Sequence, residues 1–252
     1  MPTLLERQRR LAEFLSNPGQ YKDAAAADRL ARELAITDAS RLSAAGNMVA
    51  NKRFGKIQSV MPKTMEILGA NARNVFDGFA RHCPPASISR AANARQFLEY
   101  LEQAEEIQAP DYICDVARFE YSNWSTTVNF DAALGGGTPF ADSLPGTALV
   151  RLAPQVTLLV LDHDVRCLFA ADGDVGGEGI GPQPERRPVH LAIAGREEGL
   201  PPRIFELDAG LHDAARRMVA WKTAASWCAA IAAIDMPDME ALNSIGLIEV
   251  KS

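Results

Sequence analysis

Hydrophobic residues recur with one period in the first half of this chain and with another in the second half. Up to residue 128, apolar side chains return at the spacing that places them on one face of an α-helix. Beyond Thr147 they come in short runs of the kind that form strands, at 148–152, 156–161 and 165–170. The pattern predicts an α+β protein, in which an all-helical N-terminal domain is followed by a C-terminal domain with a β-sheet.

Between these halves the composition changes over residues 129–146, which contain Gly-Gly-Gly-Thr-Pro and Ser-Leu-Pro-Gly. Glycine and proline at this density interrupt helices and strands alike, so the stretch predicts a linker. We therefore expect a helical domain at 1–128 and a second domain at 147–252. A length of 252 residues is sufficient for two modest domains.

The end of the chain has the pattern of a hairpin followed by three short helices. Apolar residues alternate with small or polar ones from Val189 to Ala194, and after a Gly-Leu-Pro-Pro break the run 203–207 is again strand-like. Three amphipathic stretches follow. Asp235 can cap the last of them and Gly246 can end it. This order predicts a winged-helix-like module.

Charge decides between the two common roles of such a module, which are reading DNA and capturing an extended peptide. From Thr147 to the end there are ten Lys/Arg and fifteen Asp/Glu, and the third helix carries Asp238 and Glu240 without a base. Phosphates would repel such a helix, because Lys/Arg contacts to phosphate supply most non-specific DNA affinity. We therefore expect a peptide to add beside strand 203–207 and reach the third helix. The expected peptide-binding residues are Arg203, Ile204, Phe205, Glu206, Leu207, Met239, Leu242 and Asn243.

A second charge feature is the helix predicted from Arg41 to Lys63, which carries basic residues and no acidic one. Two interpretations are open: a solvated basic face, or a surface that docks an acidic or mixed-charge protein. The apolar residues expected on the buried side of this helix are Met48, Val49, Phe54, Ile57 and Val60. The residues expected to dock a partner enzyme are Lys52, Arg53 and Lys56, with Arg118 and Glu120 from a later helix.

No constellation of catalytic or metal-binding residues emerges from the sequence. The four histidines are scattered, and the densest cluster, Asp162-His163-Asp164, is typical of turn hydrogen bonding as well as of a metal site. The four cysteines form no C-x-x-C pair, and the glycine-rich stretch 173–184 lacks a phosphate-loop motif. We expect no catalytic residue, no metal and no cofactor in this chain. The dispersed cysteines predict a cytoplasmic protein, and the absence of a long apolar segment predicts no membrane partner. The net charge of −6 gives no indication of a nucleic-acid partner.

Several segments resemble the HvfC/BufC-like partner proteins of multinuclear non-haem iron-dependent oxidative enzymes. The matching segments are Ala45 to Arg53, Val60 to Pro62, Ile67 to Gly69, Phe79 to Pro85, Tyr112 to Tyr121 and Val150 to Pro154. Their order and spacing follow the family, although Met61, Tyr121 and Ala153 replace its usual Phe, Trp and His, and Cys83 separates His82 from the prolines. The final stretch, 242–248, resembles the winged-helix-like precursor-recognition elements of ribosomally made peptide natural products.

The resemblance implies a function. Members of this family act beside an iron-dependent oxidative enzyme and help it engage a precursor peptide, with the iron in the enzyme. It implies here a non-catalytic adaptor that binds the precursor leader and presents it to the enzyme. Two alternatives remain open: a transcriptional regulator that combines the basic helix with the winged module, and an enzyme whose site is assembled from scattered residues.

Overall fold

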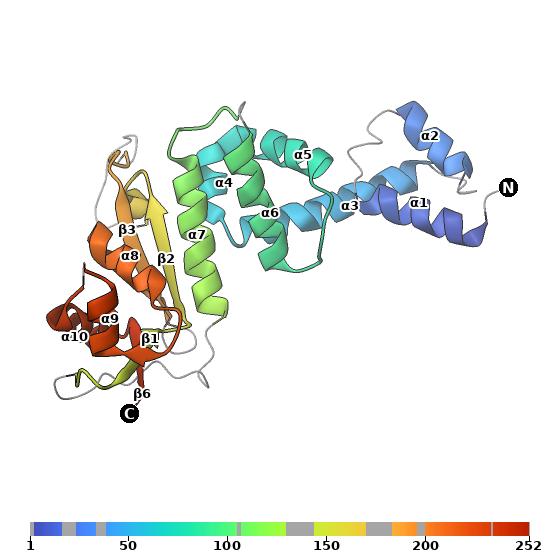
Figure 1. Ribbon diagram of the computed structural model, residues 1–252. Helices are drawn as coiled ribbons and strands as arrows, with labels where there is room; N and C mark the ends of the chain where they lie inside the picture. Colours follow the sequence, from blue (N-terminus) through green and yellow to red (C-terminus); the bar gives the residue numbers. More distant parts are fainter. Residues whose placement is uncertain are drawn as a thin grey trace. The chain divides into compact units, whose positions relative to one another are not determined.

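The computed structural model describes residues 3–16, 24–33, 39–104, 107–129, 144–169, 183–195, 200–232 and 234–251. The chain divides into two compact units, Met1–Tyr121 and Ser122–Ser252, which we call the helical unit and the sheet unit. The chain combines helices with two small antiparallel sheets, which agrees with the predicted α+β class (Figure 1). Most of the expected linker, residues 130–143, lies outside the described residues, and the division between the units falls before it.

The helical unit consists of consecutive helices, and α7 continues past its end (Figure 1). Their bounds are α1 Leu4–Ser16, α2 Ala24–Glu33, α3 Ala39–Gln58, α4 Pro62–Leu68, α5 Ala72–His82, α6 Arg90–Gln103 and α7 Ile113–Val128, with a 3₁₀ turn at Gly69–Asn71. The helix expected from Arg41 to Lys63 is shorter than predicted. It ends at Gln58, and a new helix begins at Pro62, because proline suits the first turn of a helix but not its interior.

Aromatic residues form the centre of the helical unit. Phe76, Phe79 and Phe97 are fully buried, and Phe79 packs edge-to-face on Phe97 with ring centroids 5.3 Å apart. The expected inward positions Ile57 and Val60 are buried as well. Met48 and Val49 are not: they are 59% and 36% exposed, so that prediction was wrong. Their stretch of α3 lies on the surface, next to the basic residues.

The sheet unit contains two three-stranded antiparallel sheets. The strands are β1 Leu149–Leu152, β2 Val156–Leu161, β3 Val189–Ala194, β4 Arg203–Leu207, β5 Lys222–Thr223 and β6 Ile248–Lys251. One sheet has the order β2-β3-β4, and the other has β1 between β5 and β6. The prediction of a strand at 165–170 was wrong. Val165–Leu168 form a 3₁₀ turn that Asp164 caps by accepting a bond from the backbone N–H of Arg166, and Ala170 lies outside the described residues.

Three helices follow β4, as the amphipathic pattern predicts: α8 Ala209–Arg217, α9 Ala224–Ala230 and α10 Met236–Ser244 (Figure 1). Helix α10 begins with a capping box, in which Asp235 and Asp238 each accept a hydrogen bond from the other's backbone N–H. Trp227 of α9 is buried and donates its indole N–H to the carbonyl of Val150 in β1, at 3.1 Å. The helices and both sheets therefore share one hydrophobic core.

Among the described residues, no helix combines the length and the apolar character that crossing a bilayer requires.

Candidate functional site

Strand β4 lies at the edge of its sheet. It pairs with β3 from Ala194–Arg203 to His190–Leu207, and no other described strand pairs with it. Arg203, Ile204 and Glu206 are exposed, whereas Phe205 and Leu207 pack against the core. An edge strand presents unpaired backbone N–H and C=O groups, which another extended chain can use. The five β4 residues of the expected peptide site therefore sit where strand addition is geometrically possible.

The three α10 residues expected to line a groove do not lie on the surface. Met239 and Leu242 are fully buried and Asn243 is 5% exposed, so they form core and not a groove wall. The physical reason is that α10 packs on α9 and β6, which cover its apolar face. Its outer face carries the exposed Glu240. The acidic character noted in the sequence is therefore a property of the accessible side of α10.

An ion-pair cluster fixes the middle of β4, and sequence reasoning missed it. Glu206 accepts hydrogen bonds from Arg166, at 2.5 Å, and from Arg187, at 2.7 Å. Both arginines also bind Asp164, each at 2.6 Å. The hydrogen bond from Arg166 is the largest influence on Asp164 and lowers the pKa of this carboxyl to about 2. Both arginines are thus paired with carboxylates at this edge, and Glu206 is not free to receive a ligand's cation.

In the helical unit, Arg53 lies inside the protein. Only 7% of it is exposed, because α3 turns it toward the loop after α5 and toward α6. Its guanidinium donates to the side-chain oxygens of Asn93, at 2.8 Å, and Gln96, at 3.2 Å, and to the backbone carbonyl of Cys83, at 2.7 Å. It also lies 4.2 Å from the centre of the Phe79 ring. Arg53 therefore does not lie on an exposed face of α3, and its expected docking role stays a prediction.

Lys52 and Lys56 flank this buried arginine on α3. Lys52 is exposed, and Lys56 is half-buried and donates to the backbone carbonyl of Ile88 at 2.5 Å. Between α3, α5 and the loop before α6 there is a cavity of about 270 Å³. We call it the α3 pocket. It is lined by Val49, Ala50, Lys52, Arg53, Lys56, Phe76, Ala80, Pro85, Ser87, Ile88 and Asn93.

The other two expected docking residues, Arg118 and Glu120, have partners inside the helical unit. Arg118 is half-buried and binds Glu102 at 2.6 Å and Asp115 at 3.3 Å. Glu120 is 5% exposed and accepts the backbone N–H groups of Lys63 and Thr64 at the start of α4. Burial raises the pKa of Glu120, and the hydrogen bonds from Thr64 and Lys63 oppose that shift. Glu120 therefore holds α4 in place and offers no accessible carboxylate.

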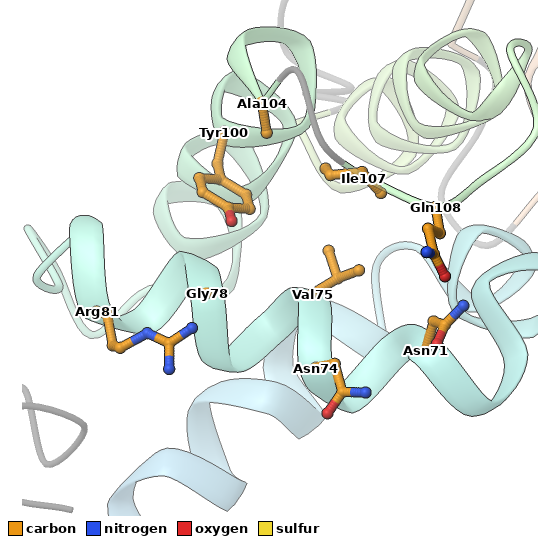
Figure 2. A pocket seen from close by; sticks show the side chains of 9 residues that line it. All are labelled: Asn71, Asn74, Val75, Gly78, Arg81, Tyr100, Ala104, Ile107 and Gln108. Atoms are coloured by element: carbon orange, nitrogen blue, oxygen red, sulfur yellow. The ribbon is translucent and has the colours of Figure 1, made fainter.

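A larger hollow of about 340 Å³ lies between α5, the end of α6 and the segment after it (Figure 2). Its polar lining comes from Asn71, Asn74, Arg81, Tyr100 and Gln108. Figure 2 shows Tyr100 pointing from α6 toward Gly78 on α5. A Cβ added at Gly78 would meet the Tyr100 hydroxyl at 2.6 Å. The sequence signal for this close contact between α5 and Tyr100 is the glycine inside a helical pattern. Glycine there costs about 1 kcal/mol relative to alanine, so its presence indicates close packing at that position.

The described residues contain no group of three His, Cys, Asp or Glu side chains that could hold a metal ion. His163 is buried and Asp162 is exposed, while Asp164 belongs to the ion-pair cluster. A pair of histidines does meet elsewhere: His190 on β3 and His212 on α8 lie edge-to-face, with ring centroids 5.2 Å apart. This contact could not be predicted from the sequence, because the two histidines are 22 positions apart on different elements and meet only in the folded protein. The glycine-rich stretch 173–180 lies outside the described residues.

Comparison with known proteins gives one partial match. A family model described as the SCO6045-like C-terminal domain matches residues 37–103. The matched range runs from the start of α3 to the end of α6, so it includes every residue that lines the α3 pocket. No curated protein matches the chain.

Proposed function

We propose that this chain is a non-catalytic adaptor in the biosynthesis of a ribosomally made, modified peptide. In this proposal it binds the leader of the precursor peptide and presents it to a multinuclear non-haem iron-dependent oxidative enzyme, which holds the iron. The observation that carries the proposal is the open edge of β4, in a sheet followed by three helices. A leader would add to β4 as a fourth strand, and its backbone groups would pair with those that β4 leaves free.

The order of elements in the sheet unit supports a winged-helix-like arrangement. Helix α8, strand β5, helices α9 and α10 and strand β6 follow one another, and β1 supplies the middle strand of their sheet. In a DNA-binding protein of this type the third helix enters the major groove. Here the third helix is α10, whose accessible side carries Glu240. Peptide capture is therefore better supported than DNA recognition.

The groove for the leader's side chains must differ from the one expected from the sequence. Met239, Leu242 and Asn243 are inside the core, so they can support the site but cannot touch a peptide without rearrangement. The exposed side chains along β4 are Arg203 and Ile204, with Glu206 held by two arginines. We propose that backbone pairing with β4 supplies most of the affinity, and that Ile204, which is 38% exposed, supplies an apolar contact.

The experiment first asks whether genes for a short peptide and for an oxidative enzyme lie beside the gene of this chain, and then uses their products. We expect the fluorescein-labelled N-terminal half of that peptide to bind the full-length protein, measured by fluorescence polarisation, and the enzyme to co-purify with it. Absence of both genes from the neighbourhood, or no binding of either product, would contradict the adaptor. Tight binding of duplex DNA at physiological salt would favour the regulator instead.

Two proline variants test the β4 edge. Successive residues of a strand direct their N–H groups to opposite sides, so one of Ile204→Pro and Phe205→Pro removes an N–H from the open edge and the other removes one that pairs with β3. Circular dichroism identifies the variant that stays folded. We expect that variant to lose leader binding and to retain enzyme binding. Leu242→Asp would not be an informative variant, because a charge at this fully buried position would destabilise the sheet unit.

A further inference from the structure

The α3 pocket contains a positive charge for which the described residues offer no negative partner. Arg53 is buried, and its hydrogen-bond acceptors are two amide side chains and one backbone carbonyl, all of them neutral. Those three bonds leave two of its five N–H donors. Burial lowers the pKa of Arg53 to about 10, which still leaves it protonated at neutral pH. A buried cation without a counter-ion costs several kcal/mol, so its retention calls for an explanation.

The surroundings of Arg53 increase the positive potential. Lys52 and Lys56 line the same cavity, and none of its lining residues is acidic. The sequence has no Asp or Glu from Ser40 to Met65, which includes all of α3 beyond its first residue. Three cations around a cavity between helices attract an anion more strongly than the same charges in bulk water would. The electrostatics of the α3 pocket therefore fit a negatively charged group.

Apolar residues make up most of the remaining wall. Phe76 and Ala80 form buried parts of it, and Ile88, at 89% exposed, stands at its rim. Met48, one residue before the pocket residue Val49, is 59% exposed. Exposed apolar surface with a polar rim is common at protein interaction sites. A small, strongly hydrated anion would gain nothing from apolar walls. A carboxylate next to a large apolar side chain would match both the positive charges and the apolar lining of the pocket.

We propose that the α3 pocket docks a segment of a partner protein in which an acidic residue is followed by large apolar ones. The carboxylate enters between Lys52 and Lys56 toward Arg53, and the apolar side chains cover Ile88 and Val49. The identity of the occupant as a protein segment rests on the proposed adaptor function. In that setting the α3 pocket is the enzyme-docking site, separate from the leader site on β4.

The test uses a synthetic probe peptide, acetyl-Gly-Glu-Leu-Phe-Gly-amide, and the full-length ¹⁵N-labelled protein observed by NMR. We expect saturable shifts at the backbone amides of Lys52, Arg53 and Ile88 and at the Arg53 Nε–H. A matched peptide with Gln in place of Glu should bind about tenfold more weakly, because the charge-assisted hydrogen bonds are lost. Equal affinity of the two peptides, or shifts confined to other residues, would overturn the proposal.

Two pairs of charge reversals separate a local site from general electrostatics. The double variant Lys52→Glu, Lys56→Glu should lower the affinity for the Glu peptide by more than about tenfold, since both cations flank the carboxylate. Arg9→Glu with Arg29→Glu changes the net charge by the same amount on exposed parts of α1 and α2, and should leave the affinity within about twofold. A similar loss of affinity in both double variants would show that only net charge matters, which would contradict a specific binding site at the α3 pocket.

Further probes check the class of ligand and the role of Arg53. Inorganic phosphate or 4-phenylbutyrate binding more tightly than the Glu peptide would assign the pocket to a small anion, against the proposal. Arg53→Lys keeps the charge but loses the planar hydrogen-bonding geometry, so it should weaken binding of the Glu peptide and leave binding of the Gln peptide unchanged.

The two proposals can fail separately. If the Glu peptide fails to bind while the leader still binds at β4, only this inference is lost. If the Glu peptide binds and no leader does, the adaptor function is contradicted and the docking role of the α3 pocket is retained.

Discussion

Glu120 on α7 accepts hydrogen bonds from both the backbone N–H and the hydroxyl of Thr64, at 2.7 and 2.6 Å. Thr64 lies in the first turn of α4, where Met61 provides no side-chain cap and Pro62 has no N–H to satisfy. A third hydrogen bond runs from the backbone N–H of Lys63 to the Glu120 carboxylate, at 2.6 Å. A carboxylate from a distant helix thus satisfies the free N–H groups at the start of α4 and complements its dipole.

This arrangement gives the first prediction. Glu120→Gln should destabilise the helical unit by about 1–3 kcal/mol, because an amide nitrogen replaces one of the two accepting oxygens and leaves a buried N–H unpaired. Thr64→Val should cost about 1 kcal/mol, because it removes the hydroxyl that donates to Glu120. The double variant should cost less than the sum, since both changes act on one hydrogen-bonded pair. Urea unfolding followed by far-UV circular dichroism measures these values.

Glu66→Gln on the same short helix is the matched control for Glu120. Glu66 binds Lys63 at 2.9 Å, but its side chain is 68% exposed, so the change should stay within about 0.5 kcal/mol. Additive effects of Glu120 and Thr64 would show that they act independently, contrary to the shared hydrogen bonds.

The second prediction compares two glycines inside helices. Gly55→Ala on α3 should stabilise the protein by about 0.5–1 kcal/mol, because a Cβ there meets nothing within 4 Å and alanine favours the helix. Gly78→Ala on α5 should destabilise it by about 1–2 kcal/mol, because the new Cβ would lie 2.6 Å from the Tyr100 hydroxyl. Thermal unfolding of the two variants provides the comparison. Equal stabilisation by both would show that Tyr100 moves away without cost.

The third prediction concerns the contact between His190 and His212. His212 is 5% exposed, and its Nε2 has no hydrogen-bond partner among the described residues. Burial is the largest influence lowering the pKa of His212, followed by the charges of His190 and Arg216, while Asp213 opposes them. In the unfolded chain His212 takes up a proton more readily, so stability should fall as the pH drops from about 7 to about 5.

Replacing the buried imidazole isolates this contribution. His212→Phe keeps an aromatic ring beside His190 and removes the titrating group, so its stability should decrease less over the same pH interval than that of the wild type. The measurement is the free energy of unfolding at several pH values. Parallel pH profiles for the two proteins would exclude His212 as the source of the dependence.

The fourth prediction concerns Asp164 at the β4 edge. Its folded-state pKa of about 2 is below the ordinary value of 3.8, because Arg166 and Arg187 hold the ionised form. The carboxylate therefore contributes stability above about pH 4, and this contribution is lost as the pH falls through about 2. Asp164→Asn should cost about 1–2 kcal/mol at neutral pH, and the difference from wild type should shrink on acidification.

Glu185→Gln is the control for Asp164. Glu185 also pairs with Arg187, at 3.5 Å, but its side chain is 76% exposed, so a change of less than about 0.5 kcal/mol is expected. A constant difference between Asp164→Asn and wild type from neutral to acidic pH would contradict the pairing with the arginines.

The sequence by itself determined most of the local structure. The period of the apolar residues located the helices α5, α6 and α7 and the strands β2, β3 and β4, because each buries a face whose spacing its own backbone geometry fixes. Asp235 marked the start of α10, since capping depends only on neighbouring residues. The hairpin pattern agreed with a pairing of β3 and β4. It could not determine that β4 lies at the edge of the sheet, because strand order depends on contacts with other segments.

The tertiary structure alone decided which polar residues are buried and what they contact. Arg53 and Lys52 are adjacent on one basic helix, yet Arg53 is inside, because Asn93, Gln96 and the Cys83 carbonyl come from other segments to receive it. Glu120 and Leu242 are buried for the same kind of reason. A residue's burial depends on the elements packed against it, and those are brought together by contacts between positions far apart in the chain.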